Sequence, residues 1–236
     1  MFYQHKKRAG YRKIHKYLIN SGYNISCNKV RLTMSSLKLK AMLRVKRPYN
    51  TIDKSNETAF PNLIANNFTS IKPNTKWYTD FTYLKLENGK VLYACFILDS
   101  YDKSVIAYQL SNSIDTQLAI DTLQVAINRT STKSSIILHS DQGVQFRAYA
   151  FKEYCKMNNI VQSMSRAGTP TQNAVMENFV GKIKCEFLNH NKFKKKTTLN
   201  EAIIEWTYNY YNTQRVHSAL GYKTPMQKRN EYYQKN

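Results

Sequence analysis

Acidic residues are scarce in this sequence, and its first 52 residues contain none. The chain has 236 residues, with 36 Lys and Arg against 15 Asp and Glu, and its formal net charge is +21. Asp53 is the first carboxylate, and 13 Lys and Arg residues precede it. Such a surplus indicates a polyanionic partner, and nucleic acid is the commonest one. Judged by charge alone, a ribosomal or otherwise basic housekeeping protein stays an alternative.

Cysteines and long apolar runs are also few. The four cysteines, Cys27, Cys95, Cys155 and Cys185, include no CxxC pair, so a zinc finger has no support and we expect buried or unreactive thiols. No apolar run approaches the roughly 18 residues that cross a bilayer. The basic start of the chain lacks the apolar stretch of a signal peptide. We therefore expect no membrane partner and a cytoplasmic location.

Residues 1–47 are predicted to form a basic DNA-binding segment that resembles a helix-turn-helix. Residues 11–20 have the apolar periodicity of a helix, and Ser21-Gly22 is a suitable end for it. Ser26 can cap a second helix, whose apolar residues again repeat at helical spacing. An ordinary helical hairpin with a solvated basic face is the alternative interpretation.

The rest of the chain is predicted to be a linker, a mixed α/β core and a tail. Residues 48–73 are polar and irregular, residues 74–213 form the core, and residues 214–236 are the tail. Within the core, strands are expected near residues 77–86, 91–99, 104–110, 135–139 and 160–165, and helices near 115–129 and 151–159. Three strands with an antiparallel pattern, followed by alternating helix and strand, indicate a mixed five-stranded sheet flanked by helices.

Two of the few carboxylates lie at unusual places in this core. Asp80 is in the middle of a strand of aromatic and β-branched residues, where an ionised carboxylate is costly unless a cation or hydrogen bonds offset it. Asp141 directly follows a buried strand, at the end where α/β folds place their sites. Asp99 and Asp102, in contrast, flank a turn, and we expect them to be structural.

Glu177 is predicted to lie on a helix that faces these strands. Thr169 and Gln172 have the pattern of a capping box, with Pro170 in the first turn. In the helix that follows, the apolar residues share one stripe, and Glu177 and Lys184 fall on another. Two carboxylates from strands and one from a facing helix can hold two Mg²⁺ ions about 3.5–4 Å apart for phosphoryl transfer.

Three sequence blocks carry a specific resemblance. WYTDFTY, HSDQGVQF and NAVMENF closely resemble the three catalytic blocks of the DDE transposases and retroviral integrases, and 35 residues separate Asp141 from Glu177, as in that superfamily. The surrounding NLIANNF, SMSRAG and YNTQRVHSALGYKTP are similar to the bacterial insertion-sequence transposases of the IS-three family. The resemblance covers nearly the whole chain, from about Gly10 to Gln227.

The resemblance implies an RNase H-like catalytic core and a set of site residues. It implies that Asp80, Asp141 and Glu177 are catalytic and bind two Mg²⁺ ions, for which Mn²⁺ can substitute. It also implies a DNA contact for Lys184, seven positions after Glu177. Further DNA contacts are expected from the N-terminal helices and from the end of the core, at Arg12, Lys13, Lys29, Arg31, Arg215 and His217. For Arg215 and His217 a structural role at a helix terminus is the alternative.

Two departures from the family pattern affect these expectations. Thr169–Gln172 stand where the family usually has Asn-Cys-Tyr-Asp, which alters the active-site loop, and Val216 stands where proline is common. Because the chain begins close to the helix-turn-helix, we expect a second-frame product or a truncated copy. A helix-turn-helix protein from an upstream frame is then a candidate partner.

The implied activity is DNA cleavage followed by strand transfer. The expected partners are the terminal inverted repeats of the element and a target DNA, with a homo-oligomer assembled on them in the bacterial cytoplasm, at the nucleoid. An RNase H-like nuclease that cuts without joining is a second hypothesis. A non-catalytic DNA-binding repressor is a third, and the presence of all three carboxylates argues against it.

Overall fold

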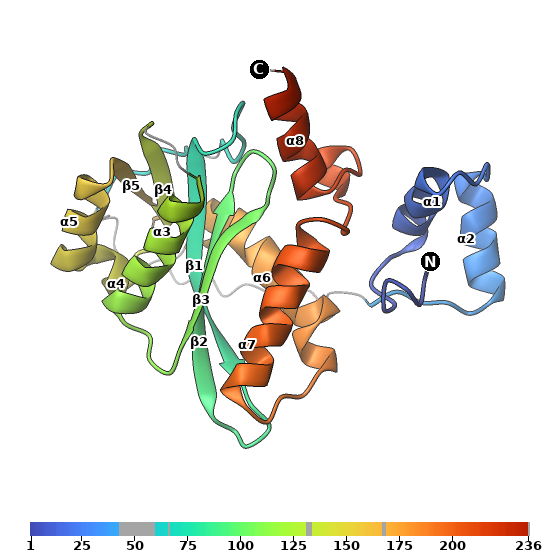
Figure 1. Cartoon of the computed structure of the whole chain (residues 1–236), viewed down its shortest axis with the longest axis horizontal. Helices are drawn as coiled ribbons and strands as arrows, with labels where there is room; N and C mark the ends of the chain where they lie inside the picture. Colours follow the sequence, from blue (N-terminus) through green and yellow to red (C-terminus); the bar gives the residue numbers. More distant parts are fainter. Residues whose placement is uncertain (43–59, 66, 131–133, 167–168, 236) are drawn as a thin grey trace.

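The computed structural model describes residues 1–42, 60–65, 67–130, 134–166 and 169–235. They form a small helical segment at the N-terminus and a larger body built on a sheet (Figure 1). The first part of the predicted linker, residues 48–59, lies outside the described residues. In the part of the chain that is described, no helix is both long and apolar enough to cross a membrane.

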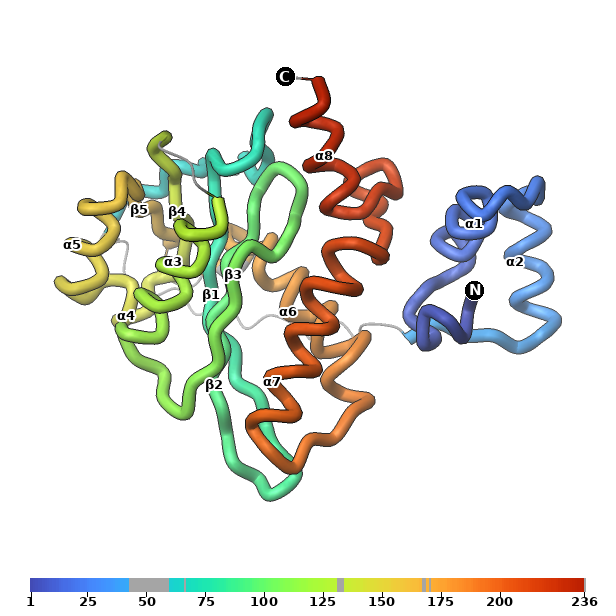
Figure 2. The backbone as a smooth tube through the Cα atoms, in the orientation of Figure 1, coloured from blue at the N-terminus to red at the C-terminus, as the bar shows by residue number. Residues whose placement is uncertain are grey.

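The N-terminal segment contains the two predicted helices, α1 (Tyr11–Asn20) and α2 (Cys27–Ser36). The Ser26 side chain accepts a hydrogen bond from the backbone N–H of Lys29, so the predicted N-cap is confirmed. Ile14 and Met34 are buried between the helices, as their spacing predicts. Figure 2 shows that this segment forms a lobe of its own beside the larger body.

The sheet has five strands in the order β3-β2-β1-β4-β5. Its strands are β1 (Lys76–Lys85), β2 (Val91–Asp99), β3 (Val105–Ser111), β4 (Ile136–Ser140) and β5 (Ile160–Met164). The first three pair antiparallel, whereas β4 is parallel to both β1 and β5. The mixed five-stranded sheet that the sequence predicts is therefore confirmed.

Helices cover both faces of the sheet. On one face lie α6 (Ala174–Glu186), α7 (Lys196–Ile204) and the π-helix η3 (Glu205–Tyr211), which bury Phe179 and Trp206 against Tyr78 and Phe96. On the other face lie α3 (Thr116–Thr130), α4 (Val144–Arg147) and α5 (Tyr149–Met157). The inward residues predicted for α3 are all buried: Leu118, Ala119, Thr122, Leu123 and Ala126. Both faces of the sheet are therefore packed against helices.

The start of α6 differs from the prediction. A 3₁₀ turn, η1 (Pro170–Asn173), precedes the helix, and the Thr169 side chain does not cap it. The Gln172 side-chain oxygen instead accepts hydrogen bonds from the Arg166 backbone N–H and from Asn62. The capping-box prediction was wrong because Gln172 is used to join this turn to two other segments of the chain.

Segments outside residues 74–213 also pack against the core. Ile64, within the predicted linker, is only 2% exposed and belongs to the cluster under α6. In the predicted tail, after the 3₁₀ turn η4 (Ser218–Leu220), α8 (Pro225–Lys235) brings Arg229 to Asp99 and Asp102, at 2.7 Å and 2.5 Å. The two aspartates are structural, as expected. The described parts of the linker and tail therefore belong to the packed body.

Candidate active site

Asp80 lies in the middle of β1, on the face that α6 covers. Its Oδ1 atom accepts a hydrogen bond of 2.8 Å from the backbone N–H of Phe81. Burial and the charge of Asp141 raise the pKa of Asp80 to about 7, and Glu177 adds to this effect. The Phe81 N–H and the ammonium of Lys184 act in the opposite direction. Asp80 is therefore the centre of a local excess of negative charge.

Asp141 follows the last residue of β4 and is exposed. Its Oδ1 atom accepts a hydrogen bond of 2.9 Å from the backbone N–H of Gly143. A Cβ atom at Gly143 would lie only 3.0 Å from the same oxygen, so a larger residue there would push against the carboxylate. β1 and β4 pair in parallel up to Tyr78 and His139, so both aspartates lie just beyond the end of this pairing.

Glu177 occupies the first turn of α6, which packs on β1. Its charge contributes to the raised pKa of Asp80, so the helix places a third carboxylate within electrostatic range of the one on β1. Among the described residues, however, no three His, Cys, Asp or Glu side chains lie close enough together to hold an ion as they stand.

The donor set nevertheless fits a hard divalent ion. The three side chains offer only carboxylate oxygens, which are the ligands that Mg²⁺ and Mn²⁺ prefer. Burial and the charge of Asp141 raise the pKa of Asp80, and a bound cation would act against both effects by favouring the ionised carboxylate.

Lys184 lies on α6 two turns after Glu177. Its ammonium stands above the ring of Tyr83, 4.3 Å from the centroid, and acts electrostatically on Asp80. Tyr83 is on β1, three residues after Asp80, and is 64% exposed. The structure therefore places Lys184 beside the carboxylates, at an accessible edge of the site.

His139 supports the site from the end of β4. Burial lowers its pKa to about 4, so the ring is neutral near pH 7. Its Nε2 donates to the carbonyl of Gln172, because a carbonyl can only accept, and Nδ1 lies 2.9 Å from the Ser163 hydroxyl. The ring thus joins β4 and β5 to the turn that leads into α6.

Comparison with known proteins identifies the family. Models of the integrase core domain match residues 71–170 and 158–225. The chain is 34% identical over 233 residues to the InsK protein for insertion sequence element IS150 of Escherichia coli K12, covering 99% of this chain and 81% of that one. It is 31% identical over 227 residues to the transposase for insertion sequence element IS904 of Lactococcus lactis, covering 95% and 88%. The chain belongs to the insertion-sequence transposases with an integrase core.

A solved structure confirms the RNase H-like fold of this transposase. The simian T-cell lymphotropic virus intasome, determined in complex with PP2A regulatory subunit B56 gamma, contains a chain that superposes with a TM-score of 0.58. The two share 16% of their residues, over 93% of this chain and 74% of the viral one.

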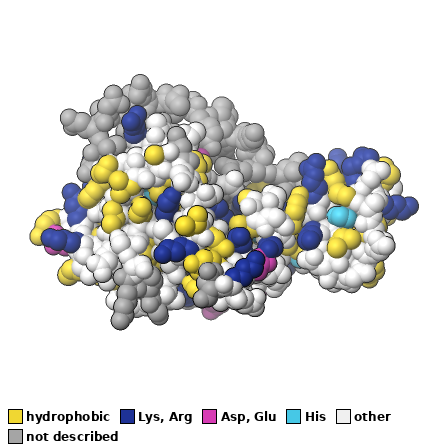
Figure 3. Space-filling model, turned by 90° about the horizontal axis from the view of Figure 1, so that it is seen from above, with side chains coloured by type: hydrophobic (Ala, Val, Ile, Leu, Met, Phe, Trp, Pro, Cys, Tyr) yellow, Lys and Arg dark blue, Asp and Glu magenta, His cyan; other side chains and the backbone are white. Residues whose placement is uncertain are grey.

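The basic N-terminal segment of the transposase exposes most of the residues that are predicted to contact DNA. Arg12, Lys29 and Arg31 are exposed on α1 and α2, and Figure 3 shows Lys and Arg side chains gathered on this lobe. Arg31 donates through Nε and a terminal nitrogen to the side-chain oxygen of Asn28, at 3.2 Å and 2.9 Å. Lys13 is only partly exposed and turns toward the core, where Glu186 lies 3.9 Å away.

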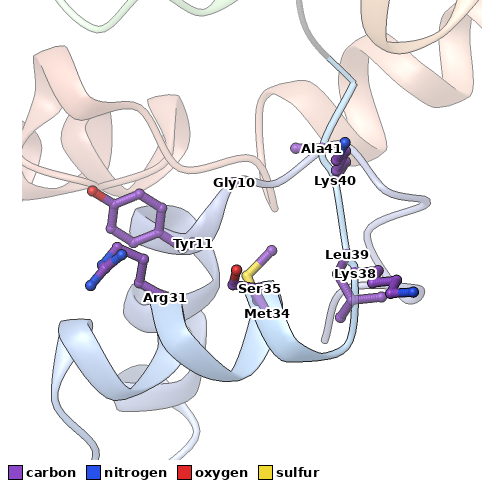
Figure 4. A pocket seen from close by; sticks show the side chains of 9 residues that line it. All are labelled: Gly10, Tyr11, Arg31, Met34, Ser35, Lys38, Leu39, Lys40 and Ala41. Atoms are coloured by element: carbon purple, nitrogen blue, oxygen red, sulfur yellow. The ribbon is translucent and has the colours of Figure 1, made fainter.

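A cavity of about 410 Å³ lies beside α2. Figure 4 shows Arg31, Met34 and Ser35 of α2 on one side of it, and the segment from Lys38 to Ala41 on the other. Three of its lining residues are basic and none is acidic. The cavity therefore extends the positive surface of the segment.

The placement of Arg215 and His217 departs from the expectation of DNA contact. They are only 3% and 4% exposed. Arg215 donates to both carboxylate oxygens of Glu186, at 2.8 Å and 2.5 Å, and lies 3.4 Å from the His217 ring. Burial and the charge of Arg215 lower the pKa of His217, which keeps its ring neutral. Their burial favours the structural role given above as the alternative, because the ion pair between Arg215 and Glu186 lies inside the protein.

Glu186 is the important residue that the sequence reasoning missed. It is buried at the end of α6, where it contacts Arg8 and Lys13 of the N-terminal segment and Arg215, which follows η3. A signal was present, because Phe179, Ile183 and Glu186 repeat at i, i+4 and i+7. A carboxylate on the apolar stripe of a helix needs a buried partner.

Proposed function

We propose that the chain is a transposase that cleaves DNA at the ends of its insertion sequence and joins the freed 3′ ends to a target DNA. Asp80, Asp141 and Glu177 are its catalytic residues and the ligands of two Mg²⁺ ions, for which Mn²⁺ can substitute. One observation carries the proposal: Asp80 lies in β1, Asp141 directly follows β4, which pairs with β1, and Glu177 lies in the first turn of α6, which packs on β1, so that both of the other carboxylates act on Asp80.

The arrangement suits phosphoryl transfer at DNA. Bound Mg²⁺ would supply Lewis-acid activation of the attacking hydroxyl and stabilisation of the leaving oxygen. β1 and the end of β4 hold Asp80 and Asp141, and the hydrogen bonds from Phe81 and Gly143 orient their oxygens. Glu177 comes from α6, which covers the face of the sheet on which Asp80 lies. Lys184 then provides a positive charge at the accessible edge, within reach of a phosphate of the element's end.

The N-terminal segment would hold the DNA. Arg12, Lys29 and Arg31 contact the terminal inverted repeat, and Lys13 adds positive charge at the junction with the core. The transposase relatives support action on DNA. We further propose a homo-oligomer on DNA, a target DNA as second substrate, and action at the bacterial nucleoid. An upstream-frame helix-turn-helix protein is the further partner that we propose.

A strand-transfer assay distinguishes this function from its alternatives. Purified protein and Mg²⁺ are incubated with labelled duplexes copied from the ends of the insertion sequence and with a plasmid target. Nicked ends and joined products support a transposase, nicked ends alone support a nuclease, and binding without either product supports a repressor. Duplexes of scrambled sequence are the control for end recognition.

A further inference from the structure

The N-terminal DNA-binding segment is joined to the catalytic body through a buried cluster. We call it the Glu186 cluster, after the residue at its centre. It contains residues from the N-terminal segment, from α6 and from the end of the core: Arg8, Lys13, Tyr17, Glu186, Arg215 and Val216. All of these side chains are buried except Lys13, which is partly exposed.

Glu186 makes polar contacts with three basic residues of this cluster. Its carboxylate accepts two hydrogen bonds from Arg215 and lies 3.9 Å from the ammonium of Lys13. Its backbone carbonyl, at the C-terminal end of α6, accepts a 2.8 Å hydrogen bond from Arg8 Nε. A cation at this end also suits the dipole of the helix. The last residue of α6 is therefore bound at once to the N-terminal segment and to the segment that follows η3.

Apolar and aromatic contacts complete the junction. Val216 is buried within the apolar cluster of the N-terminal segment itself, and its backbone N–H donates to the Tyr17 hydroxyl at 3.2 Å. The His5 ring stacks on Tyr17, with centroids 3.8 Å apart, and the Arg8 guanidinium lies 4.7 Å from the centre of the Tyr210 ring. The segment thus completes its own small core with a residue of the catalytic body.

The same helix connects this junction to the active site. Glu177 and Glu186 are nine residues apart on α6, about 13.5 Å along the axis at 1.5 Å per residue. Directional hydrogen bonds from a planar guanidinium fix an orientation that apolar packing alone leaves looser. Figure 1 shows the N-terminal segment on the side of the body where α6 and α7 lie, away from α5.

We infer that Glu186 is a positioning residue, which sets the DNA-binding segment at a defined place relative to the helix that carries Glu177. The DNA sequence held by α1 and α2 and the phosphodiester at the carboxylates then lie at a set separation. This inference rests on the proposed function for its chemistry, but the orientation that it describes can be measured without DNA.

The first experiment measures that orientation. Spin labels are placed at Ser36→Cys on α2 and Lys156→Cys on α5, both exposed positions, with Cys27 and Cys185 replaced by serine. Pulsed dipolar spectroscopy gives the distance distribution between them. Glu186→Gln keeps the shape of the side chain and removes its charge. Asp102→Asn is the matched control, because it removes a buried partner of Arg229 that lies outside the Glu186 cluster.

We expect a broader or displaced distribution for Glu186→Gln and an unchanged one for Asp102→Asn. If Glu186→Gln does not fold, Arg8→Met provides the same test from the N-terminal side, where it removes the hydrogen bond to the Glu186 carbonyl. A distribution like that of the wild type in the folded variant would overturn the inference.

The second experiment measures the consequence for cleavage. Glu186→Gln should lower cleavage of a duplex copied from the element's end by about fivefold or more relative to Mn²⁺-dependent nicking of unrelated duplex, a typical size for coupling between two sites. Asp102→Asn should lower both equally or neither. Equal losses on both DNAs in Glu186→Gln would contradict a positioning role. If the wild type cuts no DNA, the proposed function fails, and the label distances still decide the orientation.

Discussion

At the scale of single residues, Lys184 is a basic side chain whose charge acts on the carboxylate of Asp80. We expect Lys184→Ala to weaken cleavage at the element's end much more than nicking of unrelated duplex, because the ammonium is placed to meet a phosphate there. Lys184→Arg should keep part of the activity, since the charge survives in a different shape. Both DNAs are compared at one salt concentration. Tyr83→Leu is the control, because it removes the ring beneath the ammonium and keeps the charge of Lys184. Equal losses on both DNAs for Lys184→Ala would show that Lys184 is an ordinary surface charge.

Glu186 makes stability depend on pH in a predictable direction. Burial raises the pKa of this carboxyl, but the hydrogen bonds and charge of Arg215, with Lys13, outweigh burial and hold it below the ordinary 4.5. A lowered folded-state pKa stabilises the protein above the unfolded-state pKa, and the stabilisation is lost as the pH falls through the folded-state value. The melting temperature of the wild type should therefore fall as the pH is lowered below about 4.5.

Glu186→Gln should remove that contribution. We expect it to cost about 3 kcal/mol at neutral pH, because it leaves Arg215 without its buried counter-charge. The difference in unfolding free energy between wild type and variant should shrink as the pH falls below 4.5. A difference that stays constant from neutral to acid pH would show that the ion pair does not contribute.

At the scale of elements, α2 carries the exposed charge that a DNA backbone would meet. Lys29→Gln with Arg31→Gln should make the plot of log K against log salt shallower by about 0.9 for each phosphate that the variant no longer neutralises. Lys156→Gln on α5, at the far end of the body, is the control and should leave the slope unchanged. An unchanged slope in the α2 variant would exclude this helix from DNA. Point variants are preferable to deletion of residues 1–47, which would expose Val216 and Glu186.

Elements with a clear periodicity could be predicted from the sequence. The alternation in WYTDFTYLKL, the Ser26 cap and the inward stripe of α3 all depend on neighbours a few residues away. The capping box at Thr169 was wrong, because the Gln172 side chain is held by Asn62, 110 residues distant. Local patterns cannot show such a competitor.

The candidate site was predictable to a similar degree. Its carboxylates stand out because their surroundings are apolar or lie at strand ends, and a resemblance to known blocks named the same residues. The sequence left two roles open for Arg215 and His217, because their environment depends on Glu186, which lies on α6, 29 residues before Arg215. Whether a basic residue faces solvent or a buried carboxylate is decided by packing between distant segments.

At the scale of the whole molecule, metal binding should stabilise the fold. The carboxylates do not form a closed cluster among the described residues, and the pKa of Asp80 is raised by burial and by the charge of Asp141. An ion at about 100 times its dissociation constant adds about 2.7 kcal/mol, which corresponds to about 5–10 °C in the melting temperature of a chain of this size. We expect Mn²⁺ to produce this rise, EDTA to reverse it, and Asp141→Asn to abolish it. A rise of the same size in Asp141→Asn would place the ion elsewhere.

The most direct measurement is metal-dependent cleavage by the wild type and by three single variants, Asp80→Asn, Asp141→Asn and Glu177→Gln. Each purified protein is incubated with a duplex from the element's end and with Mg²⁺, Mn²⁺ or Ca²⁺, after its folding and DNA affinity have been checked. We expect cleavage by the wild type with Mg²⁺ and Mn²⁺ but not with Ca²⁺. Each variant should lose more than about a hundredfold of the rate, beyond what the loss of a supporting group alone gives. Full cleavage by any one of the three variants would contradict the assignment of the carboxylates.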